Sequence, residues 1–127
     1  MTSRLQLSPH FTIEEFDCHD GIHVPPEAID ALHFLVHHVL EPIRNAFGVV
    51  TIESGYRTPH ENGMVGGALD SHHLYDQWPA TPAVDFVCAT GMPRDWYNHL
   101  VAALSAGGVG YYRDHTHVDL RSTKTRW

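Results

Sequence analysis

The fold is decided by residues 25–53, which read PPEAIDALHFLVHHVLEPIRNAFGVVTIE. The two leading prolines suit the first turn of a helix, where a backbone N–H has no partner inside the helix. From there, apolar side chains recur every three or four residues as far as Phe47, which predicts one helix with a single apolar face. We expect Pro42 to kink this helix and Gly48 to end it. The β-branched stretch 49–53 follows at once and predicts a strand.

Shorter elements are predicted on both sides of this helix and strand. Thr12 followed by Glu15 forms a capping box, so we expect a helical turn near the N-terminus. Residues 94–104 have the pattern of a second amphipathic helix, whose inward side chains are expected to be Trp96, Leu100, Val101 and Leu104. Three short apolar stretches are expected to be strands, the last two paired in a hairpin: 83–87, 109–112 and 117–120.

The order of these elements is helix, strand, long loop, strand, helix and hairpin. This order predicts an α+β fold in which a small antiparallel sheet has its helices packed on one side. The loop 54–82 is rich in Gly, Pro, Asn and Asp, and long loops in compact domains are usually functional. A chain of 127 residues suits one domain, so we expect 1–127 to form a single domain.

The composition excludes several classes of protein. Eight Lys and Arg residues against fifteen Asp and Glu residues give a net charge of −7, so a phosphate-binding surface and a nucleic-acid partner are not expected. No stretch approaches the ~18 apolar residues of a membrane span. The first residues are too polar for a secretory signal, so we expect synthesis in the cytoplasm without a signal peptide. Cys18 and Cys88 are too few for a disulfide framework and are expected to be buried thiols.

Histidine is the unusual feature of the composition, with twelve in 127 residues. Histidine is the commonest metal ligand in proteins, and a zinc hydrolase needs three N or O ligands and one open position. His115 and His117 are two apart on an expected strand, so both can bind one metal, or one can bind while the other moves protons. The alternative for such a pair is the polar outer face of an edge strand. The residues alone leave the remaining ligands open among His72, His73, Asp70, Asp76 and Asp85.

Five motifs follow one another along the chain in a fixed order. They are Ser54-Gly-Tyr-Arg57-Thr-Pro59, Asn62 with Val65-Gly-Gly-Ala68, Ser71-x-His73, Ala83-x-Asp85-Phe86, and Gly107-Gly-Val-Gly110-x-Tyr112 with His117-Val-Asp119. With the leading His-Phe-Thr-x-x-Glu-Phe and the final Arg126-Trp127, this combination resembles the zinc D-alanyl-D-alanine carboxypeptidase family from about residue 9 to the end. That family includes phage endolysin endopeptidases and is related to the hedgehog-type metal fold.

The resemblance implies a role for each matching residue. His73, Asp85 and His117 would bind one zinc ion per chain. Arg57 would bind the substrate's carboxylate, since a planar guanidinium makes bidentate bonds to that group. Ser71 would help to hold either the substrate backbone or a neighbouring ligand.

The resemblance leaves the catalytic base open between two neighbours. Asp114 stands three residues before the last ligand, where some members of the family have an acidic residue, and His115 is the first histidine of the His-x-His pair. The implied function is hydrolysis of peptidoglycan stem peptides, as a carboxypeptidase or an endopeptidase. The protein would act on the cell wall after lysis or as part of a virion, beside phage particle proteins. The alternative is a non-catalytic virion or tail component that binds peptidoglycan with the same fold.

One departure from the family pattern concerns spacing. His73 and Asp85 are twelve residues apart, whereas the corresponding ligands in the family are closer together, so 76–82 stands as an insertion. Because closing a longer loop costs little free energy, we expect both ends to stay anchored and Trp78 to line the substrate groove. The alternative is that the insertion displaces Asp85 and leaves Asp76 as the ligand.

Two other groups of metal-binding residue types are interpreted as structural. His33 and His37 are four apart on the predicted helix, but no third ligand is near in the sequence, so we expect a solvated helix flank. Cys18 with His19 and His23 could form a second site, although packing of Cys18 beneath the helix is the preferred interpretation.

Overall fold

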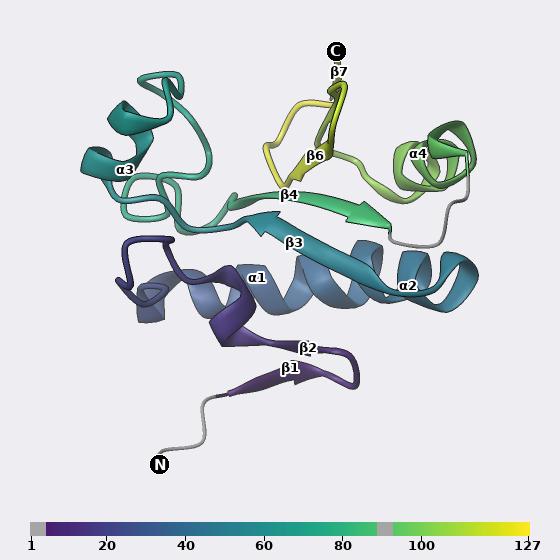
Figure 1. Cartoon of the computed structure of the whole chain (residues 1–127), viewed down its shortest axis with the longest axis horizontal. Helices are drawn as coiled ribbons and strands as arrows, with labels where there is room; N and C mark the ends of the chain where they lie inside the picture. Colours follow the sequence, from purple (N-terminus) through teal and green to yellow (C-terminus); the bar gives the residue numbers. More distant parts are fainter. Residues whose placement is uncertain (1–4, 89–92) are drawn as a thin grey trace.

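The structure, a computed structural model, describes residues 5–88 and 93–127. Figure 1 shows a sheet lying over a long helical rod, with the N-terminal ribbon on the other side of the rod. In chain order the described elements are β1 (Gln6–Ser8), β2 (Phe11–Thr12), η1 (Ile13–Phe16), η2 (Pro26–Ala28), α1 (Ile29–Leu35), η3 (Val36–Leu40), α2 (Glu41–Phe47), β3 (Val50–Ser54), α3 (Pro59–Met64), β4 (Ala83–Cys88), α4 (Arg94–Leu104), β5 (Gly108–Tyr111), β6 (Thr116–Asp119) and β7 (Thr125–Arg126).

The predicted main helix is a rod of four consecutive segments, η2, α1, η3 and α2. Its middle segment η3 is a π-helical turn just before Pro42, which has no N–H to donate to the preceding turn. The N–H of Glu41 instead donates to the carbonyl of Val36, five residues back. Gly48, with φ of 89°, ends the rod as predicted. The sequence therefore predicted where the helix is irregular, but the irregularity includes a π turn.

The main sheet has the strand order β3-β4-β6-β5-β7. Its strands are antiparallel except for β7, which runs parallel to β5. The predicted α+β class and the hairpin of β5 and β6 are confirmed. The separate β1–β2 ribbon and β7 were not predicted, because segments of two or three residues carry too little periodicity to be recognised.

Helix α4 packs against η3, α2 and β5, with Tyr97 and Val101 as its buried residues. The Tyr97 ring lies against Phe47 and Phe86, at centroid distances of 6.3 and 6.2 Å. The prediction that Trp96 faces inward was wrong, since its exposed fraction is 58%, and Leu104 is also exposed. The helix is rotated because the core space beside Phe86 is filled by the neighbouring tyrosine.

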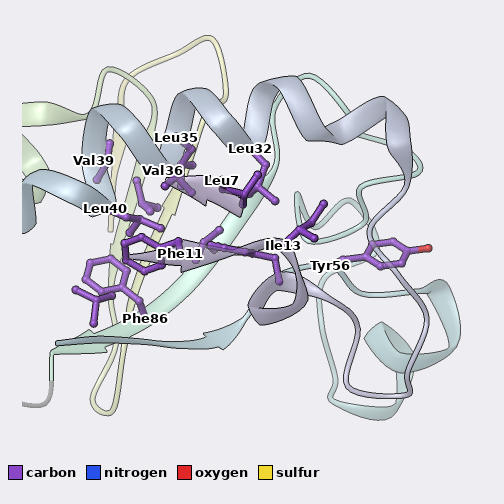
Figure 2. Packing of buried hydrophobic residues seen from close by; sticks show 14 of the residues in the cluster. Leu7, Phe11, Ile13, Leu32, Leu35, Val36, Val39, Leu40, Tyr56 and Phe86 are labelled. Carbon is purple, nitrogen blue, oxygen red and sulfur yellow. The ribbon is translucent and has the colours of Figure 1, made fainter. Parts of the chain in front are cut away.

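The strands β4 and β6 separate an apolar face from a polar one. Val84 and Phe86 are fully buried in the core on the helical side, and Figure 2 shows Phe86 beside Phe11 and Leu40. Successive side chains of a strand point to opposite faces, so Asp85 lies on the other face. The candidate site is therefore on the face of the sheet that the helices leave open.

The N-terminal ribbon closes the far side of the rod. Leu7, Phe11 and Ile13 are buried against it (Figure 2). The carboxylate of Glu41 accepts hydrogen bonds from the Ser8 hydroxyl and from the backbone N–H of His10, at 2.5 and 2.9 Å. Outside the undescribed segments 1–4 and 89–92, the helices are all too short or too polar to cross a bilayer.

Candidate metal centre

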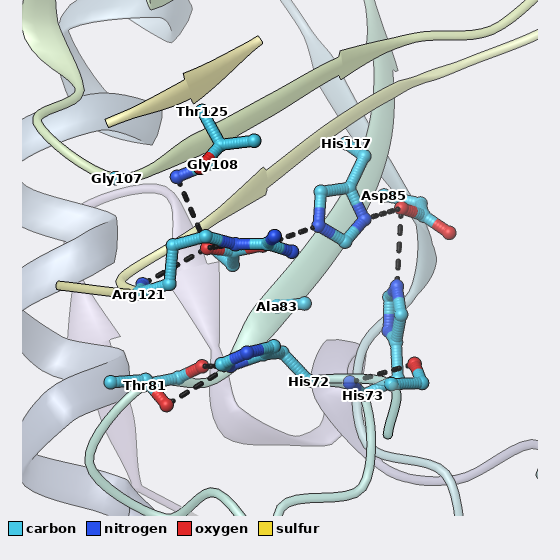
Figure 3. Close-up of polar contacts among 12 residues, drawn as sticks. His72, His73, Thr81, Ala83, Asp85, Gly107, Gly108, His117, Arg121 and Thr125 are labelled. Atoms are coloured by element: carbon cyan, nitrogen blue, oxygen red, sulfur yellow. Dashed lines mark hydrogen bonds and ion pairs between the residues drawn. The ribbon is translucent and has the colours of Figure 1, made fainter. Parts of the chain in front are cut away.

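His73, Asp85 and His117 come together on the open face of the sheet. One ligand atom from each lies within 4.8 Å of the other two, and all three side chains are buried. Asp85 on β4 is paired directly with His117 on β6, while His73 is supplied by the loop before β4. Figure 3 shows both rings directed at the Asp85 carboxylate, whose Oδ1 is 3.0 Å from His117 Nδ1 and 3.2 Å from His73 Nε2.

The ring of His73 presents an unprotonated nitrogen to this centre. Its Nδ1 is 2.7 Å from the carbonyl oxygen of Gly55, and only a protonated Nδ1 can make that hydrogen bond. Burial lowers the pKa of His73, which favours the neutral ring. Nε2 then carries a lone pair, is buried, and has no hydrogen-bond partner among the described residues. A lone pair facing a carboxylate oxygen is the arrangement expected at a site that takes a cation.

A second carboxylate, that of Asp119, orients the ring of His117 so that one of its nitrogens also faces the centre. His117 Nε2 lies 2.8 Å from Asp119 Oδ2, so its N–H donates there and Nδ1 faces Asp85. Burial would lower the pKa of His117, but the hydrogen bonds with Asp119 and Asp85 raise it overall. Both carboxylates thus favour positive charge at this ring, which a proton or a metal ion can supply. The donor set of two imidazoles and one carboxylate fits zinc.

Asp119 is fully buried and is held from several sides. It accepts hydrogen bonds from the backbone N–H groups of Gly108 and Arg121, at 3.1 and 2.9 Å, and from the Arg121 guanidinium. Burial would raise the pKa of Asp119, but the hydrogen bonds from His117 and Arg121 bring it well below the ordinary value. A Cβ atom at Gly108 would lie 2.6 Å from this carboxylate, so the position has no room for a side chain.

Arg57 and Ser71 lie beside the centre; the resemblance implies that Arg57 binds substrate and that Ser71 holds either the substrate or a neighbouring ligand. Both line a pocket of about 380 Å³ above the three candidate ligands. Arg57 Nη1 donates to the side chain of Asn62 at 3.2 Å, and Nη2 is 3.4 Å from Asp85 Oδ2. The Ser71 hydroxyl accepts a hydrogen bond from the backbone N–H of His73 at 3.2 Å, so it contacts a neighbouring candidate ligand.

The two candidate bases occupy different positions. His115 lines the pocket, with Nε2 3.6 Å from Asp85 Oδ2, and its ring stacks on Tyr112 at a centroid distance of 4.6 Å. Asp114 is outside the pocket lining, and its side chain is 86% exposed. His115 Nδ1 lies 2.8 Å from Asp114 Oδ1, and this hydrogen bond lowers the pKa of Asp114. The carboxylate therefore stands behind the imidazole.

The residues of the predicted insertion do not enter the ligand group. Asp76, the alternative ligand, accepts a hydrogen bond from the Tyr56 hydroxyl at 2.5 Å and lies outside the group of three. Trp78 stacks on His72, with ring centroids 4.5 Å apart, and lines a pocket beside the one above the candidate ligands. In the described part of the chain, the three-residue centre is the one group with metal-binding geometry.

The other residues set aside in the sequence have ordinary contacts. His33 and His37 stack on one another, and His37 Nε2 lies 3.1 Å from the carbonyl oxygen of Leu7. Cys18 is a buried free thiol, as expected, whereas Cys88 is free and only partly buried.

Sequence reasoning gave no role to three residues that support the centre. Asp119 could have been recognised, because it is two residues after His117 and shares its face of the strand. Arg121 gave no such signal, and Trp127 was noted only as part of the resemblance, without a role. The Arg121 guanidinium lies 4.8 Å from the centre of the Trp127 ring, which is itself 5.1 Å from the ring of His117. These contacts depend on how the C-terminal segment folds back along β5.

The comparison with known families agrees with this geometry. Residues 9–119 match the sequence model of a family described as Peptidase M15, which confirms the resemblance to the zinc carboxypeptidase family. The matched range includes all three candidate ligands. No curated protein matches the chain.

Proposed function

The chain belongs to the M15 peptidase family, and we propose that it is a zinc-dependent hydrolase of peptidoglycan peptides, acting as a carboxypeptidase or an endopeptidase. At the level of the family, the activity is that of a metallopeptidase. One observation carries the proposal: three buried ligand atoms, from His73, Asp85 and His117, converge beside an open pocket.

His73, Asp85 and His117 would hold the zinc ion and leave one position open to the pocket. When bound, zinc polarises a scissile carbonyl and lowers the pKa of water so that hydroxide is available near neutral pH. The chain's own contribution is to orient the two imidazoles. Gly55 and Asp119 do this by accepting the N–H of each ring on the side away from the centre, so that the other ring nitrogen faces Asp85.

We assign the proton transfer to His115. Its Nδ1–H donates to Asp114, so Nε2 is left unprotonated on the side of the pocket. Nε2 accepts a proton from the attacking water and later gives it to the amine as the C–N bond breaks, a contribution of ~10²–10⁴-fold. In this assignment Asp114 is a positioning residue, because it acts through the imidazole.

Arg57 would bind a carboxylate of the substrate and so place the peptide bond in the pocket. Its guanidinium is fixed by Asn62 and by the hydroxyl of Ser54, which preserves its orientation before substrate arrives. Ser71 would keep the backbone of His73 in place. The setting is also part of the proposal: action on the cell wall after lysis or from a virion, beside phage particle proteins.

The test is removal and return of the metal. Purified protein is treated with a chelator and dialysed, and the release of amino groups from purified cell-wall peptides is measured before and after zinc is added. We expect activity to disappear and to return with one zinc per chain. Asp85→Asn should not regain activity, whereas Asp76→Asn, a matched change at a nearby carboxylate, should. Activity that survives chelation would overturn the metal mechanism. Zinc-loaded protein that binds the wall without cutting it would favour the non-catalytic alternative.

A further inference from the structure

The polar face of the sheet continues past the metal centre toward the start of β4. Ala83 is two residues before Asp85, and it pairs with Asp119 just as Asp85 pairs with His117. Side chains two apart on a strand share a face, so these residues form the next row on the same surface. A second pocket, of about 500 Å³, lies along this direction.

The second pocket adjoins the catalytic pocket and shares two residues with it, His72 and Arg121. Figure 3 shows these two side chains on opposite sides of Ala83, with the candidate ligands beyond one side and Thr81 and Thr125 beyond the other. The two pockets therefore meet at His72 and Arg121, and we call this junction the passage. Of these two pockets, Arg57 lines only the catalytic one.

Both residues at this passage are held in place. His72 Nδ1 lies 2.8 Å from the carbonyl oxygen of Thr81, and the His72 ring stacks on the ring of Trp78. Thr81 and Trp78 belong to the segment 76–82, so the segment that separates this chain from the family pattern also fixes His72. Arg121 is anchored through Nε and Nη2 to Asp119, which leaves Nη1 without a hydrogen bond among the described residues.

The chemistry of the second pocket selects against positive charge. The described residues that line it include no carboxylate, although the whole protein carries a net charge of −7. Arg121 is the one permanent charge among its described lining residues, and the others are histidine, amide, hydroxyl and apolar side chains, with hydroxyls from Thr81, Thr123 and Thr125 among them. Hydroxyl and guanidinium donors suit the carbonyl and carboxylate acceptors of a peptide. His72 already covers one face of the Trp78 ring, which favours a peptide over a stacked sugar.

We infer that the second pocket is a substrate subsite, which binds the peptide segment beyond the catalytic pocket and prefers neutral or acidic groups to basic ones. The inference rests on the proposed function and deepens it, because it predicts that longer, acidic peptides are the better substrates. Arg121 would meet an acidic group at the passage, and the segment 76–82 would form one wall.

The test compares three synthetic cell-wall peptides: a short one, the same peptide with two added residues including Glu, and the same extension with Lys in place of Glu. The extension is made at the end remote from the carboxylate that Arg57 binds. We expect the acidic extension to raise kcat/KM by ~10–100-fold, the effect of one charged hydrogen bond, and the Lys extension to give little or no gain. Thr123→Trp, which fills the second pocket, should remove the gain. Thr51→Trp, the same substitution at an exposed residue of β3, should keep it.

Binding to the metal-free protein gives a second readout, followed by NMR at the indole N–H of Trp78. The acidic peptide should shift this signal and the Lys peptide should not. If wild type cleaves none of the peptides but the acidic one still shifts Trp78, the proposed function fails while the subsite survives. Equal kcat/KM for all three peptides, equal behaviour of the two Trp variants, or a shift produced only by a wall disaccharide would overturn the subsite.

Discussion

The two faces of β4 and β6 are built from neighbouring residues and are governed by different forces. Phe86 and Val118 face the helices, are fully buried, and gain their stability from apolar area removed from water. Asp85 and His117, each one residue earlier, face the open side and are fixed by hydrogen bonds and charge. Thr116 marks the same boundary, because its hydroxyl contacts Asn98 on α4 while its neighbour His117 faces the pocket.

This contrast teaches that stability and function are separable along a single strand. On the apolar face, the volume of a side chain matters more than which apolar residue supplies it, since packed interiors are sensitive to single methylene groups. The polar face depends on the identity of each atom, since one misplaced proton removes a ligand. Substitutions at adjacent positions should therefore fail in different ways.

The largest expected effects come from substituting the adjacent residues 85 and 86, one on each face, and comparing the loss of zinc with the loss of stability. Asp85→Asn keeps the shape but removes a charged ligand, so zinc should be lost and kcat/KM should fall by at least ~10³-fold. Phe86→Ala should lower the free energy of unfolding by ~3–5 kcal/mol, measured by denaturant titration of the metal-free protein. Asp85→Asn should change that free energy by less.

The control for the packing effect is Phe34→Ala, the same change at a side chain that is 53% exposed. Its cost should be clearly smaller, because less apolar area is lost. The separation of the two faces would be refuted if Asp85→Asn unfolded the metal-free protein as strongly as Phe86→Ala does, or if Phe86→Ala abolished zinc binding without loss of stability.

The same contrast explains how much of the molecule was predictable. Periodicity identified the rod, β4 and the terminal hairpin, because burial on one face leaves a repeating pattern in the sequence. For α4 it identified the helix 94–104 and the buried Val101, but it chose Trp96 where Tyr97 is buried, since both are large aromatic residues and the choice depends on space beside Phe86.

The candidate site was less accessible to such reasoning. Composition could not distinguish His72 from His73, although the structure gives them different positions, one at the passage and one in the centre. The order of the family motifs made that distinction. Neither route indicated Arg121, and the resemblance included Trp127 without giving it a role, because the contacts of both residues come from the fold of the C-terminal segment.

On the polar face, substitutions at His115 and Asp114 test which of the two residues transfers the proton. His115→Ala should lower kcat by ~10²–10⁴-fold and leave zinc content unchanged, because in the proposed mechanism the imidazole transfers protons without binding the metal. Asp114→Asn should have a smaller effect, since its carboxylate is exposed and acts only through the ring. Metal analysis and steady-state kinetics on the same preparations decide this. If the larger loss belongs to Asp114→Asn, then the carboxylate is the base.

The smallest expected effect is at Asp119, which contacts the candidate ligand His117 and is not itself a ligand. Asp119→Asn keeps the volume but weakens the acceptor that fixes the N–H of His117, so zinc affinity should fall by ~10–100-fold, measured by competition with a chromogenic chelator. Asp70→Asn is the control for charge alone, because Asp70 lines the pocket itself but makes no hydrogen bond to a candidate ligand among the described residues. Equal losses in both variants would mean that the general negative charge of the pocket attracts the metal. A loss confined to Asp119→Asn would mean that the polar face works by orienting single atoms, which is the property that separates it from the packed face behind it.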